Sequence, residues 1–366
     1  MFERRLSFHL DWALLGALLA LCGMGLVMIY STTYNLAADQ AGGEFWKQMQ
    51  ALVLGLVLMA ACMLIDYRSL TQRSLFIYAG VIVLLLCVFA FGVVRGGARR
   101  WIPLGFFNLQ PSEFGRIAVA LVLAMYFGEN RRGARMSSDL LVGAVFTLIP
   151  FLLIARQPDL GTAATLLPVY LGIAYLAGLR MRLLVVAAVI AVILSPVAWT
   201  YALKPYQKER IQTFLDPSRD ARGAGYQQIQ ARVTVGSGGL TGKGFRLGTQ
   251  GGYGFLPVAH NDFVFSVLAE EHGFIGVLTA LGLYLFVILR SLDAARLAKD
   301  KVGTYLVVGI VSGFSFQVMY NITMSAGLAP VKGLTLPLMS YGGSSLIATL
   351  AAFGLILNVR MRRFTN

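Results

Sequence analysis

Residues 12–30 read WALLGALLALCGMGLVMIY, a run without one charged side chain. A helix needs about 20 predominantly apolar residues to cross the hydrocarbon core of a bilayer, so this run is long enough for one crossing. The apolar region of a cleaved signal peptide is shorter, about 7–15 residues, and here further apolar runs follow. We therefore expect residues 12–30 to form an uncleaved first transmembrane helix.

The whole chain shares this apolar character. Of its 366 residues, 57% are hydrophobic and 13% are charged, and the mean hydropathy is +0.70. Soluble domains carry about 25% charged residues, so this composition excludes a soluble fold. We expect an all-α integral membrane protein, a single polytopic domain over residues 1–366 with about ten transmembrane helices. The expected spans are 12–30, 47–65, 74–94, 112–128, 140–155, 159–178, 183–202, 263–289, 303–325 and 341–359.

The net charge of +14 does not indicate a nucleic-acid-binding protein. Such proteins gather basic residues on one face, whereas here they form short clusters between apolar runs, as membrane topology requires. With the N-terminus inside, the cytoplasmic segments hold most Lys and Arg residues of the short loops, which predicts that both termini are cytoplasmic. Cys22, Cys62 and Cys87 lie inside apolar runs without CxxC spacing, so we expect small buried hydrophobic residues rather than disulfides or a metal site.

A long segment, residues 203–261, separates the seventh and eighth expected spans and lies outside the membrane on this topology. Its mixture of aromatic, glycine and basic residues favours a functional outer loop over a disordered one. The glycine-rich stretch 236–244 does not fit a phosphate-binding loop, because Ser237 stands where the first glycine belongs and Gly244 where Ser or Thr must hold magnesium. A backbone that turns tightly and approaches another surface still fits.

Ionisable residues within the apolar runs are the sharpest functional signal. A charge at the centre of a membrane helix costs about 2.5–3.5 kcal/mol, so such a residue normally faces the bundle interior or a cavity. Glu113 and Arg116 are three residues apart, and so are Arg156 and Asp159 around Pro158, which we expect in the first turn of a new helix. We expect each pair to neutralise itself and to tie helices together or line a cavity.

Asp262 opens the eighth expected span, where two interpretations compete. An aspartate at a helix start commonly caps free backbone N–H groups, and the alternative is a functional carboxylate in a polar cavity. Glu270 and Glu271 lie more than two turns deeper and also need polar neighbours or a cavity.

The segment 321–345 is the last candidate. Glycine and proline residues interrupt an otherwise apolar stretch that contains Lys332. Broken helices at membrane depth are tolerated where they line a cavity or are buried in protein. We therefore expect a re-entrant or kinked segment beside a site rather than an ordinary outer loop.

These segments together resemble the SEDS family (shape, elongation, division and sporulation proteins), and its RodA branch more than its FtsW branch. The short N-terminal tail and the GKG and GTQ motifs favour RodA. The resemblance covers nearly the whole chain, with its motifs in the family's order. The matching motifs are RRWI (99–102), QPSEF (110–114), QPDLGT (157–162), GAGY (223–226), GSGGL (236–240), GKG (242–244), GTQ (248–250), HNDF (260–263) and the glycine- and proline-punctuated signature 321–344.

The resemblance implies peptidoglycan glycosyltransfer, in which lipid II is polymerised into glycan strands on the outer face of the bacterial cytoplasmic membrane during elongation. The family's catalytic aspartate maps onto Asp262 and its important outer-loop tryptophan onto Trp101. Asn261 and Val258 depart from the commoner Thr and Glu, so no carboxylate role carries over to position 258.

The chemistry agrees with a single catalytic carboxylate. Glycosidases need two, because their leaving group must be protonated, whereas a diphosphate leaves without a proton, so one base and nearby cations suffice. Asp262 is the expected base, and His260 and Trp101 are expected to contact substrate. Lys332 first, then Arg100, Arg210 or a divalent cation, would hold the diphosphate.

The resemblance also implies a class B penicillin-binding protein as partner, with apolar grooves between helices for the undecaprenyl chain of the membrane lipid substrate. Two other functions stay open from the residues alone. A lipid II flippase or transporter would also use a polar cavity among ten helices. A scaffold that only positions the penicillin-binding protein would not need the Asp262 carboxylate.

Overall fold

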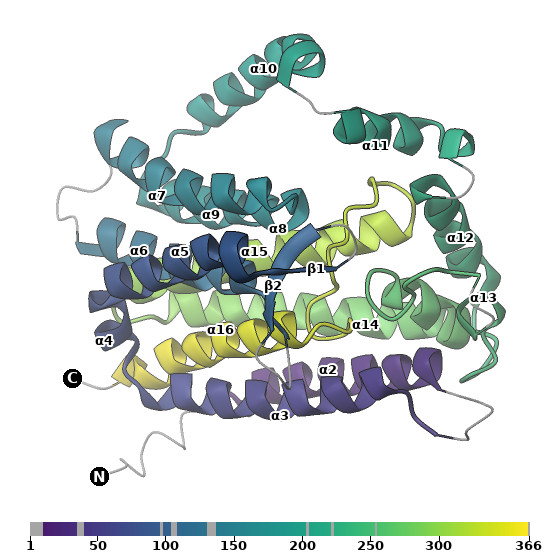
Figure 1. The fold of residues 1–366 in the computed structure, drawn as a ribbon. Coiled ribbons are helices and arrows are strands. Elements are labelled where there is room, and N and C mark those ends of the chain that lie inside the picture. The colour runs from purple at the N-terminus through teal and green to yellow at the C-terminus, as the bar shows by residue number, and fades with distance from the viewer. Residues whose placement is uncertain are drawn as a thin grey trace.

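The computed structural model describes residues 10–34, 40–95, 98–103, 108–129, 137–202, 205–220, 223–252 and 255–364. They form a bundle of long helices that run side by side (Figure 1). Among these residues, eight helical spans are long and apolar enough to cross a membrane. They comprise α2 (Trp12–Thr33), α3 (Gly43–Leu64), α5 (Ser74–Phe91), α7 (Ser137–Arg156), α8 (Leu160–Ala164) with α9 (Leu166–Ala177), α14 (Val264–Arg296), α15 (Lys301–Ser325) and α16 (Gly343–Met361).

The other two expected spans correspond to α6 (Pro111–Glu129) and α10 (Met181–Val197). Charged side chains in the first turns of α6 lower its hydropathy, and α10 has 17 residues before it continues into a π-helix, η1 (Ala198–Ala202). Ten spans therefore remain a prediction. Arg4, Arg5, Arg131, Arg132 and Arg135, on which the predicted orientation partly depends, lie outside the described residues.

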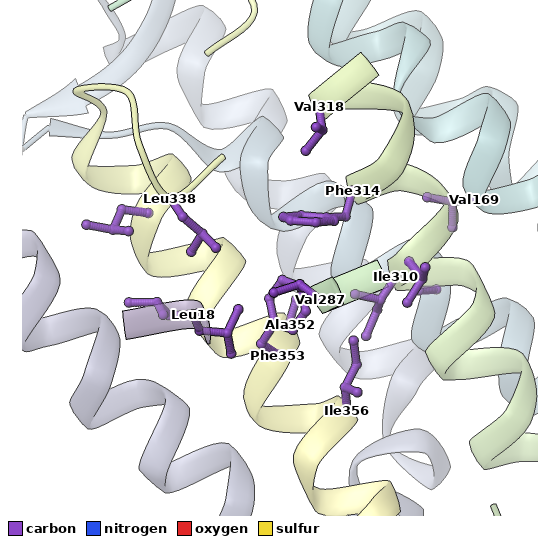
Figure 2. Packing of buried hydrophobic residues seen from close by; sticks show 14 of the residues in the cluster. Leu18, Val169, Val287, Ile310, Phe314, Val318, Leu338, Ala352, Phe353 and Ile356 are labelled. Carbon is purple, nitrogen blue, oxygen red and sulfur yellow. The ribbon is translucent and has the colours of Figure 1, made fainter. Parts of the chain in front are cut away.

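The α16 helix is the centre of the bundle, with every residue of its apolar window buried, whereas only 22% of the corresponding α5 window is buried. Glycines let it approach α3 closely: a Cβ on Gly354 would lie 2.6 Å from the Met59 carbonyl oxygen. Small residues commonly permit such contacts between membrane helices. Phe353 of α16 meets Phe314 of α15 edge to face, with ring centroids 4.9 Å apart (Figure 2).

Buried charges join the helix ends on the side of the bundle where the chain terminates (Figure 1). Asp11 caps α2 by accepting a hydrogen bond from the Leu14 N–H at 3.2 Å. Its other carboxylate oxygen pairs with Arg290 at 2.8 Å and Arg360 at 2.7 Å, which links α2, α14 and α16. Asp300 caps α15 in the same way. Cys22, Cys62 and Cys87 are free thiols; Cys22 is buried, as predicted, whereas Cys62 and Cys87 are half-buried.

A short sheet stands between α5 and α6, where only loop was expected. Strands β1 (Val93–Arg95), β2 (Ala98–Pro103) and β3 (Asn108–Leu109) pair antiparallel in that order. The short helix α4 (Tyr67–Gln72) joins α3 to α5. Strand β2 carries Arg100 and Trp101, two of the predicted site residues.

The segment 203–261, expected as an outer loop between two spans, contains helices where the structure describes it, and its position outside the membrane stays a prediction. It contains α11 (Pro205–Leu215), the 3₁₀ turn η2 (Pro217–Asp220), α12 (Ala224–Ser237) and α13 (Thr249–Gly252). Its glycine-rich part packs backbone to backbone on α14, where Gly273 interrupts the helix with φ 61° and ψ −159°. A Cβ on Gly238 would lie 1.8 Å from the Ala269 carbonyl oxygen, so the tight approach expected there depends on glycine.

Glu270 and Glu271 find polar neighbours through this packing. The Glu270 carboxylate is fully buried and lies 2.7 Å from Lys243 Nζ, and it accepts the Thr249 N–H at 2.9 Å. The Ser31 hydroxyl donates to Glu271. The carboxylates therefore attach the 238–250 segment to α14 instead of opening into a cavity of their own.

Candidate active site

Asp262 lies in the turns that precede α14 and is half-buried. Phe263 is the N-cap residue of α14 and no side chain caps it, so the interpretation of Asp262 as a helix cap is wrong. Among the described residues, none donates a hydrogen bond to the Asp262 carboxylate. The side chain is therefore available to accept a proton from a bound molecule.

The site is electrostatically mixed around Asp262. Burial raises the pKa of Asp262 to about 6, the Arg100 guanidinium opposes this rise, and the Asp159 carboxylate adds to it. A carboxyl with this pKa is mostly ionised at neutral pH and is a better proton acceptor than an ordinary aspartate. Strand β2 and the start of α8 thus bring Arg100 and Asp159 to the turn before α14.

Asp159 pairs with Arg100 rather than with Arg156. Its Oδ2 lies 3.4 Å from Arg100 Nη1, and its Oδ1 accepts the Thr162 N–H at 3.2 Å, which caps α8. Arg156 ends α7 and is exposed, and among the described residues it makes no ion pair with Asp159. The expected Arg156–Asp159 pair is wrong because the turn between α7 and α8 directs Asp159 into the bundle. Pro158 precedes this cap instead of occupying the first helical turn.

The segment between α15 and α16 passes directly beside Asp262. A Cβ built on Gly333 would lie 3.5 Å from Asp262 Oδ2, and one built on Gly161 would lie 3.1 Å from the Lys332 carbonyl oxygen. Several apolar side chains of this segment are buried, including Leu334 and Leu336, so it is not an ordinary outer loop.

Lys332, the neighbour of Gly333 in this segment, and Arg210 of α11 are close enough to interact electrostatically. Lys332 is half-buried, with Nζ 6.0 Å from the centre of the Tyr320 ring. Burial lowers the pKa of Lys332, and the nearby Arg210 guanidinium lowers it further. Arg210 is exposed on α11. Two neighbouring cations repel each other, and an anion between them would relieve that repulsion.

Trp101 and His260 are also half-buried near the site. The Arg100 guanidinium lies over the Trp101 ring, 5.2 Å from its centre. His260 meets Tyr341 edge to face at 5.6 Å, and its carbonyl oxygen accepts the Tyr341 N–H at 2.9 Å. Burial lowers the pKa of His260 and the charge of Glu44 raises it.

Glu113 and Arg116 form an ion pair on α6 and line a cavity between α6, α9, α15 and α16. Arg116 also donates to the Gln317 side-chain oxygen. The pair thus belongs to the bundle interior, and its described polar contacts are with each other and with Gln317 rather than with Asp262.

Three amide side chains that sequence reasoning left without a role hold the site together. Gln110 Nε2 donates to Asp159 Oδ2 at 3.1 Å. Gln317 Nε2 donates to the Thr335 carbonyl oxygen at 2.9 Å, and Asn321 Nδ2 to that of Leu334 at 2.7 Å. For Gln317 and Asn321 the available signal was their position inside the apolar helix α15, because amides there need partners, as charges do.

The described residues contain no group of three or more His, Cys, Asp or Glu side chains that could hold a metal ion. Asp159 and Asp262 approach each other, but Asp159 is already bound by Arg100, Gln110 and the α8 backbone. A divalent cation here would need further ligands from a bound molecule, and its presence remains a prediction.

Comparisons with known proteins find relatives that match almost the whole chain. A family model for FtsW, RodA and SpoVE, described as cell cycle protein, matches residues 12–364. Peptidoglycan glycosyltransferase MrdB of Escherichia coli K12 is 38% identical over 97% of this chain and 94% of its own length. Peptidoglycan glycosyltransferase RodA of Treponema pallidum is 34% identical over 96% and 98%. A probable peptidoglycan glycosyltransferase FtsW of Alkalilimnicola ehrlichii is 39% identical over 96% and 89%.

Solved structures match over almost the entire chain. One comes from work on the coordination of polymerization and crosslinking by a peptidoglycan synthase complex, with TM-score 0.84, 34% identity and coverage of 98% of this chain and 99% of that one. Another is the crystal structure of the rod shape determining protein RodA of Thermus thermophilus, with TM-score 0.73, 30% identity and 98% coverage of both chains.

Proposed function

The chain belongs to the FtsW, RodA and SpoVE family and is, like its relatives, a peptidoglycan glycosyltransferase in a bacterial membrane, and we propose that Asp262 is the base with which it polymerises lipid II. The observation that supports this role most directly is the state of the Asp262 carboxylate. It is half-buried, receives no hydrogen bond from the described residues, and has a pKa of about 6.

In the proposed reaction a sugar hydroxyl of one substrate attacks the anomeric carbon of another. The new glycosidic bond forms as the bond to the diphosphate breaks, and Asp262 takes the hydroxyl proton. The diphosphate leaves with the electron pair of the broken bond and needs no proton. One carboxylate therefore suffices, in contrast to the pair that glycosidases use.

Lys332 and Arg210 are the proposed diphosphate contacts. Their mutual repulsion favours an anion between them, and charge-assisted hydrogen bonds to phosphate oxygens are strong. Arg100 is better suited to hold Asp159 and to set the pKa of Asp262, because its guanidinium already faces both carboxylates. Trp101 and His260 are proposed to contact the sugars, since both are half-buried, the Trp101 ring lies against Arg100, and His260 is two residues before the base.

The proposed orientation places Asp262 and residues 203–261 on the outer face of the cytoplasmic membrane, with both termini in the cytoplasm. The excess of Lys and Arg in the opposite loops supports this. A class B penicillin-binding protein is the proposed partner, and a function in cell elongation follows from the RodA-like motifs. The likeness to a chain of a peptidoglycan synthase complex supports such an assembly.

The test is polymerisation of fluorescent lipid II by the purified full-length protein, with Asp262→Ala and Asp262→Asn as variants. Both should form no glycan polymer. Asp293→Asn is the matched control, because Asp293 lies near the opposite end of α14, is partly exposed, and pairs only loosely with Arg296 at 3.6 Å. Normal polymerisation by Asp262→Asn would refute the role of Asp262. If that variant also supported cell elongation, the scaffold interpretation would be favoured.

A second measurement distinguishes a flippase from a glycosyltransferase. Lipid II is placed in one leaflet of proteoliposomes and its appearance in the other leaflet is followed with a membrane-impermeant reagent. Transbilayer movement by both the native protein and Asp262→Ala, without polymer from either, would favour a flippase.

A further inference from the structure

Helix α15 presents two buried amide side chains, one helical turn apart, to the segment that carries Lys332. Gln317 is 1% exposed and Asn321 is 0% exposed. Residues four apart lie on the same face of a helix. These amides hold neighbouring carbonyl groups of the 326–342 segment, which has no helix of its own in this region.

Asn321 makes a second contact that Gln317 lacks. Its Nδ2 donates to the Asp262 carbonyl oxygen at 2.9 Å as well as to the Leu334 carbonyl oxygen at 2.7 Å. A primary amide nitrogen carries two hydrogens, so one atom can serve both carbonyls. A single side-chain nitrogen therefore links the backbone of the base to the segment that holds Lys332.

Gln317 is fixed differently. Its oxygen accepts from Arg116 and its nitrogen donates to the Thr335 carbonyl oxygen at 2.9 Å. Because a guanidinium can only donate, the amide cannot turn around. Gln317 thus supports the same segment without touching Asp262, which makes it a natural control.

The position of the Asp262 carboxylate is set by the hydrogen bonds of the Asp262 backbone. No described residue donates a hydrogen bond to its carboxylate, and its own N–H reaches the Val258 carbonyl oxygen only at 3.3 Å. The Asn321 contact at 2.9 Å is the shorter of these two backbone bonds; the Asn321 side chain that donates it is fully buried, and the bond as a whole is partly buried. Hydrogen bonds in such an environment are strong, and a lost donor leaves a costly unpaired carbonyl.

We propose that Asn321 is a positioning residue for glycan polymerisation, which sets the Asp262 carboxylate relative to Lys332. The proposal rests on the proposed role of Asp262 as base. A displacement of about 1 Å at a reacting group can lower a rate on the order of 100-fold. Asn321→Leu, which removes both hydrogen bonds, should therefore lower kcat on the order of 10- to 100-fold while KM for lipid II stays within about threefold.

The experiment measures initial rates of lipid II polymerisation by the full-length protein and by Asn321→Leu, Gln317→Leu, Lys332→Ala and the double variant Asn321→Leu/Lys332→Ala. Gln317→Leu should lose less kcat than Asn321→Leu at a comparable loss of thermal stability. If Asn321 aligns the base with the cation, Lys332→Ala should cost several-fold less in the Asn321→Leu background than in the native one. A residue that only stabilises the fold would leave the two effects independent.

Three results would overturn the proposal: a kcat for Asn321→Leu within twofold of native, a fall in kcat equal to that of Gln317→Leu, or independent effects of Asn321→Leu and Lys332→Ala. If Asn321→Leu does not fold, Asn321→Ser replaces it, keeps one donor, and should show an intermediate kcat. Asp262→Ala is measured alongside. An active Asp262→Ala refutes the base itself, whereas an inactive Asp262→Ala beside a fully active Asn321→Leu refutes only the positioning role.

Discussion

The rate of polymerisation should depend on pH through Asp262, and its two charged neighbours should move that dependence in opposite directions. The base must be ionised to accept a proton. With a pKa of about 6, about 91% of it is ionised at pH 7 and about 9% at pH 5. We therefore expect kcat/KM to fall about tenfold between pH 7 and pH 5 and to level off above pH 7.

The neighbours provide a test of the geometry. Arg100 lowers the pKa of Asp262 and Asp159 raises it. Arg100→Gln should therefore move the midpoint to higher pH, and Asp159→Asn should move it to lower pH. Removing a charge close to a carboxyl changes its pKa on the order of one unit, equivalent to about 1.4 kcal/mol. Asp159→Asn keeps an oxygen for the Thr162 N–H, so the start of α8 should survive.

The assay is the initial rate of lipid II polymerisation at limiting substrate from pH 5 to pH 8, at constant ionic strength. The quantity to compare between variants is the pH at the midpoint of the profile. The absolute rate is not compared, because either variant can also weaken substrate binding. Asp293→Asn should leave the midpoint unchanged. A native profile that is flat from pH 5 to pH 7, or midpoints that shift in the same direction in the two variants, would refute this account of the site.

Three further predictions concern stability, each checked by thermal unfolding of the purified protein in detergent. Gly238→Ala should destabilise by about 1–3 kcal/mol or more, because its Cβ would lie 1.8 Å from a backbone oxygen. Gly236→Ala, whose Cβ would meet no neighbouring element within 4 Å, should be neutral or stabilising by up to about 1 kcal/mol because Gly236 lies in α12, and equal effects of the two changes would contradict the packing. Lys243→Met should cost about 3 kcal/mol by leaving the buried Glu270 without its cation, and Lys243→Met/Glu270→Leu should recover part of that loss; no recovery would argue against the pair. Asn358→Leu should lower the free energy of unfolding by about 3 kcal/mol, because the Asn358 amide nitrogen donates to the carbonyl groups of three residues at the end of α3. An unchanged unfolding temperature would show that water replaces this amide.

Hydropathy located the helices well, because a bilayer requires long apolar runs whatever the helices touch. It could not rank them. The α16 helix is central and α5 is peripheral, yet both are apolar, since lipid accepts the same side chains as a protein interior. The β1–β3 sheet was missed because its strands have two to six residues, too few for a reliable alternating pattern.

The sequence likewise predicted some contacts of the candidate site correctly and missed others. Spacing along one helix correctly paired Glu113 with Arg116. It failed for Asp159, whose partner Arg100 comes from a strand 59 positions earlier, because only the folded chain brings β2 to the start of α8. Spacing also favoured a cap at Asp262, one residue before the true N-cap, Phe263. The family resemblance singled out Asp262, and the structure supplied the Arg100 and Asn321 contacts around it.

The interruption at Gly273 has a mechanical consequence for this enzyme. Helix α14 has 33 residues, roughly 50 Å at 1.5 Å per residue, which exceeds the roughly 30 Å of a bilayer core. Gly273 divides it into a short part, residues 264–272, next to Asp262 and a longer part, residues 274–296. The short part of α14 is bound to the glycine-rich segment by the Lys243–Glu270 ion pair. Among the described residues, the backbone hydrogen bonds of the longer part to that segment lie next to Gly273. The glycine-rich segment is therefore connected to Asp262 through residues 264–272, the short part of α14, rather than through the longer part beyond Gly273.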